Sequence, residues 1–264
     1  MIERNEMSIP ELNYKRYGSG KPILILHGFL GSLDNWHTLA TEFGKSGFEV
    51  YTLDMRNHGR SPHTSQHSIS LMVDDVKLFI EQHNLISVSL LGHSMGGKVA
   101  MQFALTYPEL IDNLVVVDIA PRAYKSGHDD VFDAIRNIDL DSIQSRKEAE
   151  EMMKPFLGDF STRQFILKNL ERNEDGKYQW KFNFEVLHRD YAEMISAIYS
   201  TNIFEGPTLF IKGANSIYIQ ENDRSDIEKY FPNATIQVIE LAAHWVHADQ
   251  PKLFFDTVIN FLNR

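Results

Sequence analysis

A serine between closely spaced glycines is the residue best placed to do chemistry in this sequence. Ser94 stands in the run Gly-His-Ser-Met-Gly-Gly at residues 92–97, which follows an apolar stretch and precedes a segment of helical character. This run matches Gly-x-Ser-x-Gly, a turn from strand to helix so tight that glycine is needed two residues before and after the serine. The unpaired N–H groups at the start of the helix stabilise negative charge beside the hydroxyl. The pattern predicts that Ser94 is a nucleophile rather than part of a structural turn.

The cysteine and histidine content limits the chemistry available to this serine. The chain has no cysteine, which excludes thiol nucleophiles, disulfides, iron–sulfur clusters and thiolate zinc sites. A serine hydroxyl needs a nearby base, and histidine, with an ordinary pKa of about 6.5, suits that task. Eleven histidines are present, and the residue types alone do not choose among them.

Short apolar runs alternate with longer amphipathic segments along most of the chain. This rhythm predicts βα units around a mostly parallel sheet with helices on both faces, an α/β fold. We expect strands at residues 22–26, 48–53, 87–91, 114–117, 208–211 and 235–241, and helices at residues 36–43, 68–83, 96–106, 223–230 and 251–262. Ser94 then follows the third of these strands.

The strand rhythm stops between residues 121 and 200. Apolar positions in this stretch, such as Ile135, Phe156, Leu167 and Leu170, predict several helices. We expect residues 121–200 to form a helical cap inserted in a core built from residues 1–120 and 201–264. Most of the cap's many aromatic residues are expected to pack within the cap rather than to contact a substrate.

Charge and hydropathy exclude several classes of partner. The 26 basic and 36 acidic residues give a net charge of −10, which argues against a nucleic acid or an anionic membrane surface as the main partner. Residues 1–12 are charged and lack the apolar core of a signal peptide. No stretch approaches the ~18 apolar residues that a membrane span needs. A cytoplasmic location is the default expectation.

Three histidines lie close together in a turn-rich segment. His58, His63 and His67 lack an accompanying pattern of acidic residues, so we expect solvated loop histidines rather than metal ligands. Neither a metal nor a cofactor is expected.

With these motifs the chain resembles the α/β-hydrolase family over about residues 12–262. Residues 27–31, His-Gly-Phe-Leu-Gly, follow the first buried strand as the oxyanion loop of that family does. The resemblance implies that the backbone N–H groups of Phe29 and Met95 form the oxyanion hole, and a plain turn using two glycines is the alternative. Residues 54–61 match the family's Asp-x-Arg-x-His-Gly-x-Ser segment. That segment is usually structural, so we assign it no catalytic role.

The family's chain order of serine, acid and histidine places the base in the loop after the last strand. His244 precedes Pro251 by the seven residues usual in the family, and His247 does not. We therefore expect His244 to be the base, although Ala243 replaces the usual glycine. His247 is expected to be a polar neighbour at the start of the final helix.

The acid is less obvious than the base. The loop after the fifth predicted strand, where the family commonly has it, contains no carboxylate before Glu221 and Asp223. Asn215 or Ser216 in that loop could orient a histidine but could not stabilise its cation. Some α/β-hydrolases carry the acid one strand earlier, where Asp118 ends an apolar run. We expect Asp118 to be the acid, with Asp223 or Glu221 as the alternative.

Several segments together resemble the YbfF-type bacterial esterases more closely. They are His-Gly-Phe-Leu-Gly-Ser at 27–32, Asp-Met-Arg-Asn-His-Gly-Arg-Ser-Pro-His at 54–63, Gly-His-Ser-Met-Gly-Gly-Lys at 92–98, Val-Asp-Ile-Ala-Pro at 117–121, Asn-Ser-Ile-Tyr at 215–218 and His-Trp-Val-His-Ala-Asp-Gln-Pro at 244–251. The resemblance implies a carboxylesterase or acyl-CoA thioesterase that acts on a small-molecule acyl ester or thioester. It would use a Ser-His-Asp triad and an acyl-enzyme intermediate. Arg122 and Lys125 could meet an anionic group of the substrate, but ordinary surface positions are the simpler expectation.

Two other functions stay open at this point. One is a lyase or carbon–carbon bond hydrolase that uses the same triad, and the less favoured one is a ligand-binding protein that has lost catalysis. Haloalkane dehalogenases and epoxide hydrolases share the fold, but they carry an aspartate where this chain has Ser94.

Overall fold

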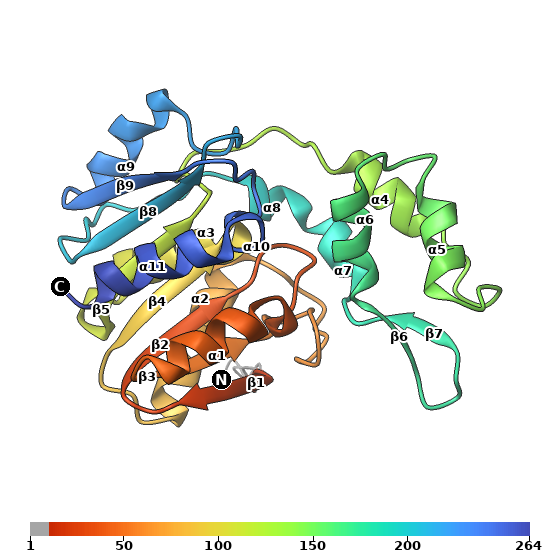
Figure 1. Ribbon diagram of the computed structural model, residues 1–264, viewed down its shortest axis with the longest axis horizontal. Coiled ribbons are helices and arrows are strands. Elements are labelled where there is room, and N and C mark those ends of the chain that lie inside the picture. The colour runs from red at the N-terminus through yellow and green to blue at the C-terminus, as the bar shows by residue number, and fades with distance from the viewer. Residues whose placement is uncertain (1–10) are drawn as a thin grey trace, which may run out of the picture.

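A seven-stranded sheet with helices on both faces forms the larger part of the computed structural model, which describes residues 11–264 (Figure 1). The strand order is β1-β3-β2-β4-β5-β8-β9, with β1 antiparallel to β3 and all other neighbours parallel. The strands are β1 (Tyr14–Gly18), β2 (Lys21–Leu26), β3 (Phe48–Leu53), β4 (Val88–His93), β5 (Ile111–Val117), β8 (Thr208–Gly213) and β9 (Ala234–Ile239). The predicted α/β architecture is confirmed.

The edge strand β1 is missing from the sequence prediction. Four of its five residues are exposed and Tyr17 is half-buried, so the segment has no apolar run that would mark a strand. The predicted strand at residues 235–241 ends two residues earlier, because β9 stops at Ile239 and Leu241 takes a left-handed φ of 61°.

Helices cover the two faces of the sheet in separate hydrophobic clusters. The helices α1 and α11 pack on one face, and α2, α3 and α9 pack on the other. The helical elements of the core are a 3-10 turn η1 (Leu33–Trp36), α1 (His37–Lys45), α2 (Ile69–Gln82), α3 (Met95–Thr106), η2 (Pro108–Leu110), η3 (Glu221–Asp223), α9 (Arg224–Tyr230), α10 (Val246–Asp249) and α11 (Pro251–Leu262). Every predicted core helix is present with small shifts of its ends.

The chain between β5 and β8 forms a second lobe beside the sheet (Figure 1). Its elements are α4 (Asp129–Arg136), α5 (Arg146–Met153), α6 (Phe160–Leu167), β6 (Leu170–Arg172), β7 (Tyr178–Trp180), α7 (Phe184–Arg189) and α8 (Tyr191–Ile195). The lobe has its own apolar cluster, which Leu30 of the core joins. On this basis we propose that residues 121–200 form a cap inserted in the core, as the sequence predicts.

One detail of the cap prediction is wrong. Leu170 does not continue a helix but begins the hairpin of β6 and β7. The turn between the two strands has the sequence Asn-Glu-Asp-Gly at residues 173–176. Its glycine, Gly176, takes a φ of 78°, a conformation that other residues rarely adopt. The apolar spacing around Leu170 gave no sign of this change from helix to strand.

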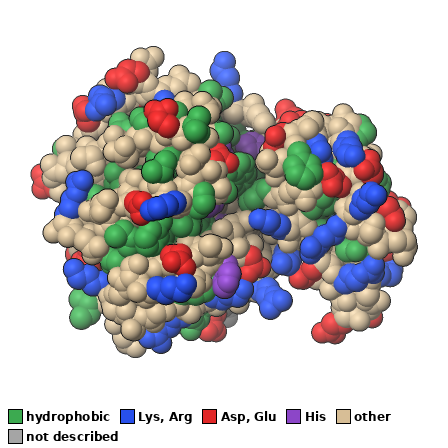
Figure 2. All heavy atoms as spheres, viewed as in Figure 1, with side chains coloured by type: hydrophobic (Ala, Val, Ile, Leu, Met, Phe, Trp, Pro, Cys, Tyr) green, Lys and Arg blue, Asp and Glu red, His purple; other side chains and the backbone are tan. Residues whose placement is uncertain are grey.

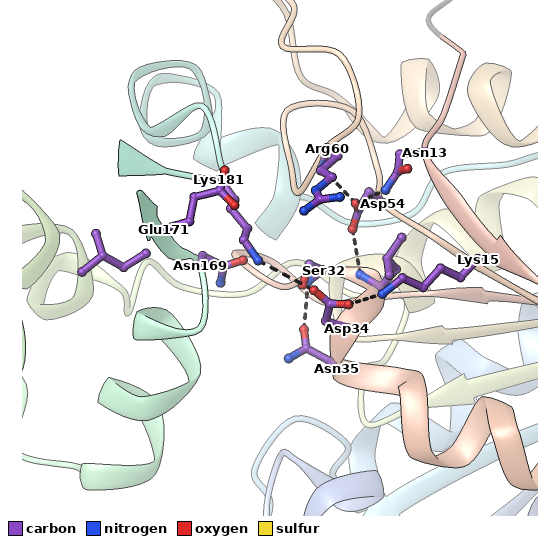
Figure 3. Close-up of polar contacts among 12 residues, drawn as sticks. Asn13, Lys15, Ser32, Asp34, Asn35, Asp54, Arg60, Asn169, Glu171 and Lys181 are labelled. Carbon is purple, nitrogen blue, oxygen red and sulfur yellow. Dashed lines mark hydrogen bonds and ion pairs between the residues drawn. The ribbon is translucent and has the colours of Figure 1, made fainter. Parts of the chain in front are cut away.

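Asp54 connects the segment at residues 54–61 to its surroundings (Figure 3). Its carboxylate accepts hydrogen bonds from Asn13 Nδ2 at 2.7 Å, from the Leu33 N–H at 2.8 Å and from the Arg60 N–H at 2.9 Å. Arg56 in the same segment makes two 2.6 Å hydrogen bonds to the buried carboxylate of Asp75 on α2. These contacts agree with the structural role that the resemblance implies for the segment.

The expectation of solvated histidines in this region is wrong for two of the three. His58 and His67 are 0% and 1% exposed, whereas His63 is exposed. The cap covers this loop, and Asp190 accepts a hydrogen bond from the His67 N–H at 2.9 Å. Burial holds the pKa of His58 well below its ordinary value and lowers that of His67 to about 3.

The cap is also joined to the core beside the oxyanion loop (Figure 3). Asn169 Nδ2 donates a 2.8 Å hydrogen bond to the carbonyl oxygen of Leu30. Lys181 Nζ lies 3.7 Å from a carboxylate oxygen of Asp34 in η1. The position of the cap is thereby coupled to the loop that contains Phe29.

Two sequence expectations concern membranes and the N-terminus. No helix within residues 11–264 combines the length and the apolar character needed to cross a bilayer. The expected absence of a signal peptide concerns residues 1–12, of which residues 1–10 lie outside the described part of the chain.

Candidate active site

Ser94 lies in a strained turn between β4, which ends at His93, and α3, which begins at Met95. Its φ of 52° and ψ of −115° lie outside the regions that residues other than glycine normally occupy. A Cβ on Gly92 would lie 2.1 Å from the carbonyl oxygen of Gly96, and one on Gly96 would lie 2.4 Å from that of Leu26. Both glycines are therefore required for the turn, as predicted from the Gly-x-Ser-x-Gly pattern.

Three of the predicted site residues form one hydrogen-bonded chain. His244 Nε2 lies 3.1 Å from Ser94 Oγ, and His244 Nδ1 lies 2.8 Å from Asp118 Oδ2. Because a carboxylate only accepts, Nδ1 carries a proton and Nε2 presents its lone pair to the serine hydroxyl. The residues come from three separate sheet connections, after β4, β5 and β9. This arrangement can withdraw the proton of a serine hydroxyl.

The carboxylate of Asp118 is fully buried and held from two sides. The backbone N–H of Gly213 donates to its Oδ1 at 3.1 Å, and the hydroxyl of Ser216 donates to its Oδ2. Its own N–H donates to the carbonyl oxygen of Ile211 at 2.8 Å, and its φ is 52°. All three partners belong to β8 or the loop that follows it.

The alternative acids are engaged elsewhere. Asp223 makes a 2.7 Å ion pair with Arg122 Nε and accepts a 2.8 Å hydrogen bond from the Gln220 N–H. Glu221 lies 3.6 Å from Arg224. Within the described residues, Asp118 is the carboxylate that pairs with His244. Arg122 is thus a partly buried member of an ion pair rather than an ordinary surface residue.

Aromatic rings and a backbone contact fix the position of His244. The Tyr218 ring is stacked on its imidazole, with ring centroids 3.9 Å apart and an interplanar angle of 21°. His93 Nε2 lies 2.9 Å from the His244 carbonyl oxygen. Burial holds the pKa of His93 well below its ordinary value, so His93 is neutral and its Nε2 carries the donated proton. The imidazole of His244 therefore has little freedom to rotate away from Ser94.

His247 is more buried than a polar neighbour at a helix start would be. It belongs to α10, is 6% exposed and is stacked on Trp36, with ring centroids 4.2 Å apart. Burial lowers its pKa to about 3. His247 makes no hydrogen bond to Ser94, and its role is in the packing of the core.

Phe29 and Met95 present backbone N–H groups beside Ser94. Within the described residues, neither N–H donates to an acceptor of the protein. The neighbouring Leu30 N–H, by contrast, donates to His58 Nε2 at 3.2 Å. A Cβ on Gly28 would lie 2.8 Å from His93 Nδ1, so glycine allows the loop to lie against the nucleophile turn. Two free donors at this place can receive an oxyanion.

Two cavities meet at Ser94, in the hollow between core and cap where hydrophobic and histidine side chains gather (Figure 2). The larger cavity has a volume of about 540 Å³ and the smaller about 300 Å³. Phe29 and Tyr218 line both cavities together with Ser94. The serine is thus open to a bound small molecule on two sides.

Sequence reasoning missed some residues of this site. Ser216 was considered as a partner of the histidine, but it bonds to Asp118 instead. The sequence motifs include Tyr218 and Lys98 but assign a role to neither, although Tyr218 packs on His244 and Lys98 lines the larger cavity. The one available signal for Lys98 is its position in the first turn of the helix that begins directly after Ser94.

Comparison with known proteins now identifies the family. Residues 21–251 match the family described as alpha/beta hydrolase fold. The chain belongs to the α/β-hydrolase family. It is 38% identical over 253 residues to the sn-1-specific diacylglycerol lipase ABHD11 of Danio rerio, covering 93% of this chain and 79% of that protein. It is 34% identical to Esterase YbfF of Escherichia coli strain K12, covering 93% and 94% of the two chains.

A solved structure supports the same assignment. The structure titled "Marine microorganism esterase" is 40% identical, with a TM-score of 0.93 over 96% of this chain and 99% of that chain. The predicted α/β-hydrolase of YbfF type is therefore confirmed, and the chain is an α/β-hydrolase of the esterase and lipase type.

Proposed function

We propose that this chain hydrolyses small-molecule carboxylic esters through an acyl-enzyme on Ser94. The observation that carries the proposal is the hydrogen-bonded chain from Ser94 Oγ through His244 to Asp118. Its position where two cavities meet supports a role in chemistry rather than in folding. The names of the relatives, an esterase and a lipase, support the same reaction class.

The proposed reaction has two halves. In the first, Ser94 Oγ attacks the acyl carbonyl while His244 Nε2 takes its proton, and Asp118 stabilises the imidazolium. The N–H groups of Phe29 and Met95 stabilise the oxyanion. His244 then gives the proton to the departing alcohol. In the second half, His244 activates a water that releases the carboxylic acid and restores the serine.

The same steps apply to an acyl thioester, in which a thiol leaves in place of an alcohol. A panel of oxygen esters and acyl thioesters of graded chain length distinguishes the two classes by kcat/KM. The proposal for esters predicts turnover of the oxygen esters across that panel.

Labelling with a fluorophosphonate tests the nucleophile directly. We expect one label per folded molecule on Ser94, and loss of both labelling and esterase turnover in Ser94→Ala. A Ser225→Ala variant is the matched control, since Ser225 is exposed on α9 and lines neither cavity. Wild-type turnover by Ser94→Ala would contradict the proposal, and a folded wild type that fails to label would favour a non-catalytic binding protein.

A carbon–carbon bond hydrolase on the same triad is the second candidate. Lys98, Arg122 and Lys125 line the larger cavity, and such a basic group suits a polycarboxylate. Turnover of such acids with little ester hydrolysis would favour this candidate over the esterase.

A further inference from the structure

The two cavities that meet at Ser94 differ in their relation to His244. His244 lines the smaller cavity, together with Trp245, and does not line the larger one. Met95, whose N–H belongs to the proposed oxyanion hole, lines the larger cavity and not the smaller one. Because His244 must hand its proton to the leaving group within hydrogen-bonding reach, the alcohol part of an ester belongs in the smaller cavity. The acyl chain then extends into the larger one.

The same two cavities differ in charge. Among the described residues, the lining of the larger cavity includes Lys98, Arg122 and Lys125 and no carboxylate. The lining of the smaller cavity includes Asp130 and Asp159 and neither lysine nor arginine. A negative charge on the part of the substrate in the larger cavity should therefore favour binding. A negative charge on the part in the smaller cavity should oppose it.

Lys98 is the residue that makes the larger cavity unusual. It is 1% exposed and lies on α3 one turn after Ser94. Its Nζ donates hydrogen bonds to the carbonyl oxygens of Arg122, at 3.2 Å, and Ser196, and it lies 5.0 Å from the centroid of the Tyr124 ring. Within residues 11–264 it has no ion pair with a carboxylate, whereas Arg122 has Asp223. A buried ammonium without a counter-ion is unfavourable, and an anion bound beside it would remove that penalty.

We propose that the preferred substrates are esters whose acyl part ends in a carboxylate and whose alcohol part carries no negative charge. This inference rests on the proposed ester hydrolysis. Lys98 would pair with the distal carboxylate of a short dicarboxylic monoester. The aspartates of the smaller cavity would disfavour an anionic leaving group, coenzyme A included. The net charge of −10 opposes anions in general, so a preference for one must come from these local residues.

Pairs of esters of equal shape test each half of the inference. For the acyl side, monoethyl glutarate is compared with ethyl 5-methylhexanoate, in which an isopropyl group replaces the carboxylate. For the alcohol side, O-butyryl glycolate is compared with isobutyl butyrate. We expect kcat/KM to be about tenfold or more higher for the glutarate ester than for its neutral partner, a factor equal to about 1.4 kcal/mol. The glycolate ester should be slower than isobutyl butyrate.

The acyl-side ratio is kcat/KM for monoethyl glutarate divided by kcat/KM for ethyl 5-methylhexanoate. Its dependence on pH can be measured on the wild type alone. Burial, assisted by Arg122, lowers the pKa of Lys98 to about 7, so its charge is lost as the pH rises above that value. The other titratable groups that line this cavity are Arg122, Lys125, His128 and three tyrosines, Tyr124, Tyr191 and Tyr218. Burial lowers the pKa of His128 and raises those of the tyrosines, so none of these four gains a charge near pH 7. The ratio should fall between pH 6 and 8, and titration of the triad cancels in it.

Substitution of Lys98 gives an independent readout. In Lys98→Met the ratio should fall toward one, and in Lys252→Met, on the exposed side of α11, it should stay at the wild-type value. A ratio near one in the wild type, a ratio unchanged by Lys98→Met, or a preference for the anionic alcohol would overturn the inference. If Lys98→Met does not fold, a ratio independent of pH in the wild type overturns it equally. If the wild type cleaves none of the four esters, or if Ser94→Ala cleaves them, the proposed function is contradicted instead.

Discussion

The hydroxyl of Ser216 donates a hydrogen bond to Asp118 Oδ2, the same oxygen that pairs with His244 Nδ1 at 2.8 Å. Ser216 lies in the loop after β8, which contains no carboxylate before Glu221. The neighbouring N–H of Gly213 donates to the other oxygen of Asp118 at 3.1 Å. The loop where the acid is commonly found in this family therefore supports a carboxylate that comes from the adjacent strand, β5.

Replacement of Ser216 by alanine should weaken catalysis without abolishing it. The variant loses one of the hydrogen bonds that orient the Asp118 carboxylate toward His244, and a hydrogen bond to a charged group contributes about 1.5–3 kcal/mol. We expect kcat on p-nitrophenyl butyrate to fall by about 10- to 100-fold, with little change in KM. Ser142→Ala in the cap, where Ser142 is exposed, is the control. A kcat equal to that of the control would show that Ser216 does not position the acid.

Substitution of the two competing acids separates their roles. Asp118→Asn should lower kcat by about 10⁴-fold, because an amide cannot stabilise the imidazolium and favours the wrong tautomer of His244. Asp223→Asn removes the ion pair with Arg122 but no contact with Ser94 or His244, and it should change kcat by less than about tenfold. Both are measured with the same ester, after circular dichroism has shown that each variant folds. The reverse order of effects would assign the acid to Asp223.

The sequence indicates residues that lie in local motifs, and it does not reveal contacts between segments that are far apart in the chain. Ser94, His244 and Asp118 each follow a strand and belong to motifs that are continuous in the chain. Local spacing indicates Ser94, whereas the choice of His244 and Asp118 also needs the chain order of the family that the sequence resembles. The support for Asp118 from Ser216 depends on β8 lying beside β5 in the sheet, and no local pattern reports that adjacency. The burial of His58 and His67 depends on the cap covering a loop more than a hundred residues away in sequence. Edge strand β1 was missed for the opposite reason, because its exposed residues leave no apolar pattern.

The glycines of the nucleophile turn should be intolerant of a single methyl group. Gly92→Ala would place a Cβ 2.1 Å from the Gly96 carbonyl oxygen, and such overpacking costs about 1–3 kcal/mol or more. We expect the free energy of unfolding, measured with urea, to fall by at least that amount, and esterase turnover to fall with it. Gly158→Ala is the control, because a Cβ there would have no atom within 4 Å. Equal stability of the two variants would mean that the turn can relax.

Two buried histidines should make the protein sensitive to mild acid. Burial lowers the pKa of both His67 and His247 to about 3, whereas the pKa of a histidine in the unfolded chain is about 6.5. Below pH 6.5 the unfolded state therefore binds protons that the folded state does not, and stability falls as the pH falls. Each of these two histidines contributes a loss of about 2 kcal/mol between pH 7 and pH 5. His58 and His93, whose pKa values burial also holds well below the ordinary value, add to the loss in the wild type.

Urea unfolding at pH 7, 6 and 5 measures this loss, and variants identify its source. His247→Gln and His67→Gln should each be less stable than the wild type at pH 7, because they disturb packed rings such as the stack on Trp36. Each should also lose about 2 kcal/mol less than the wild type on going from pH 7 to pH 5. His63→Gln, at an exposed position, should follow the wild-type pH dependence. A wild-type free energy of unfolding that stays constant from pH 7 to pH 5 would show that these histidines are protonated in the folded state.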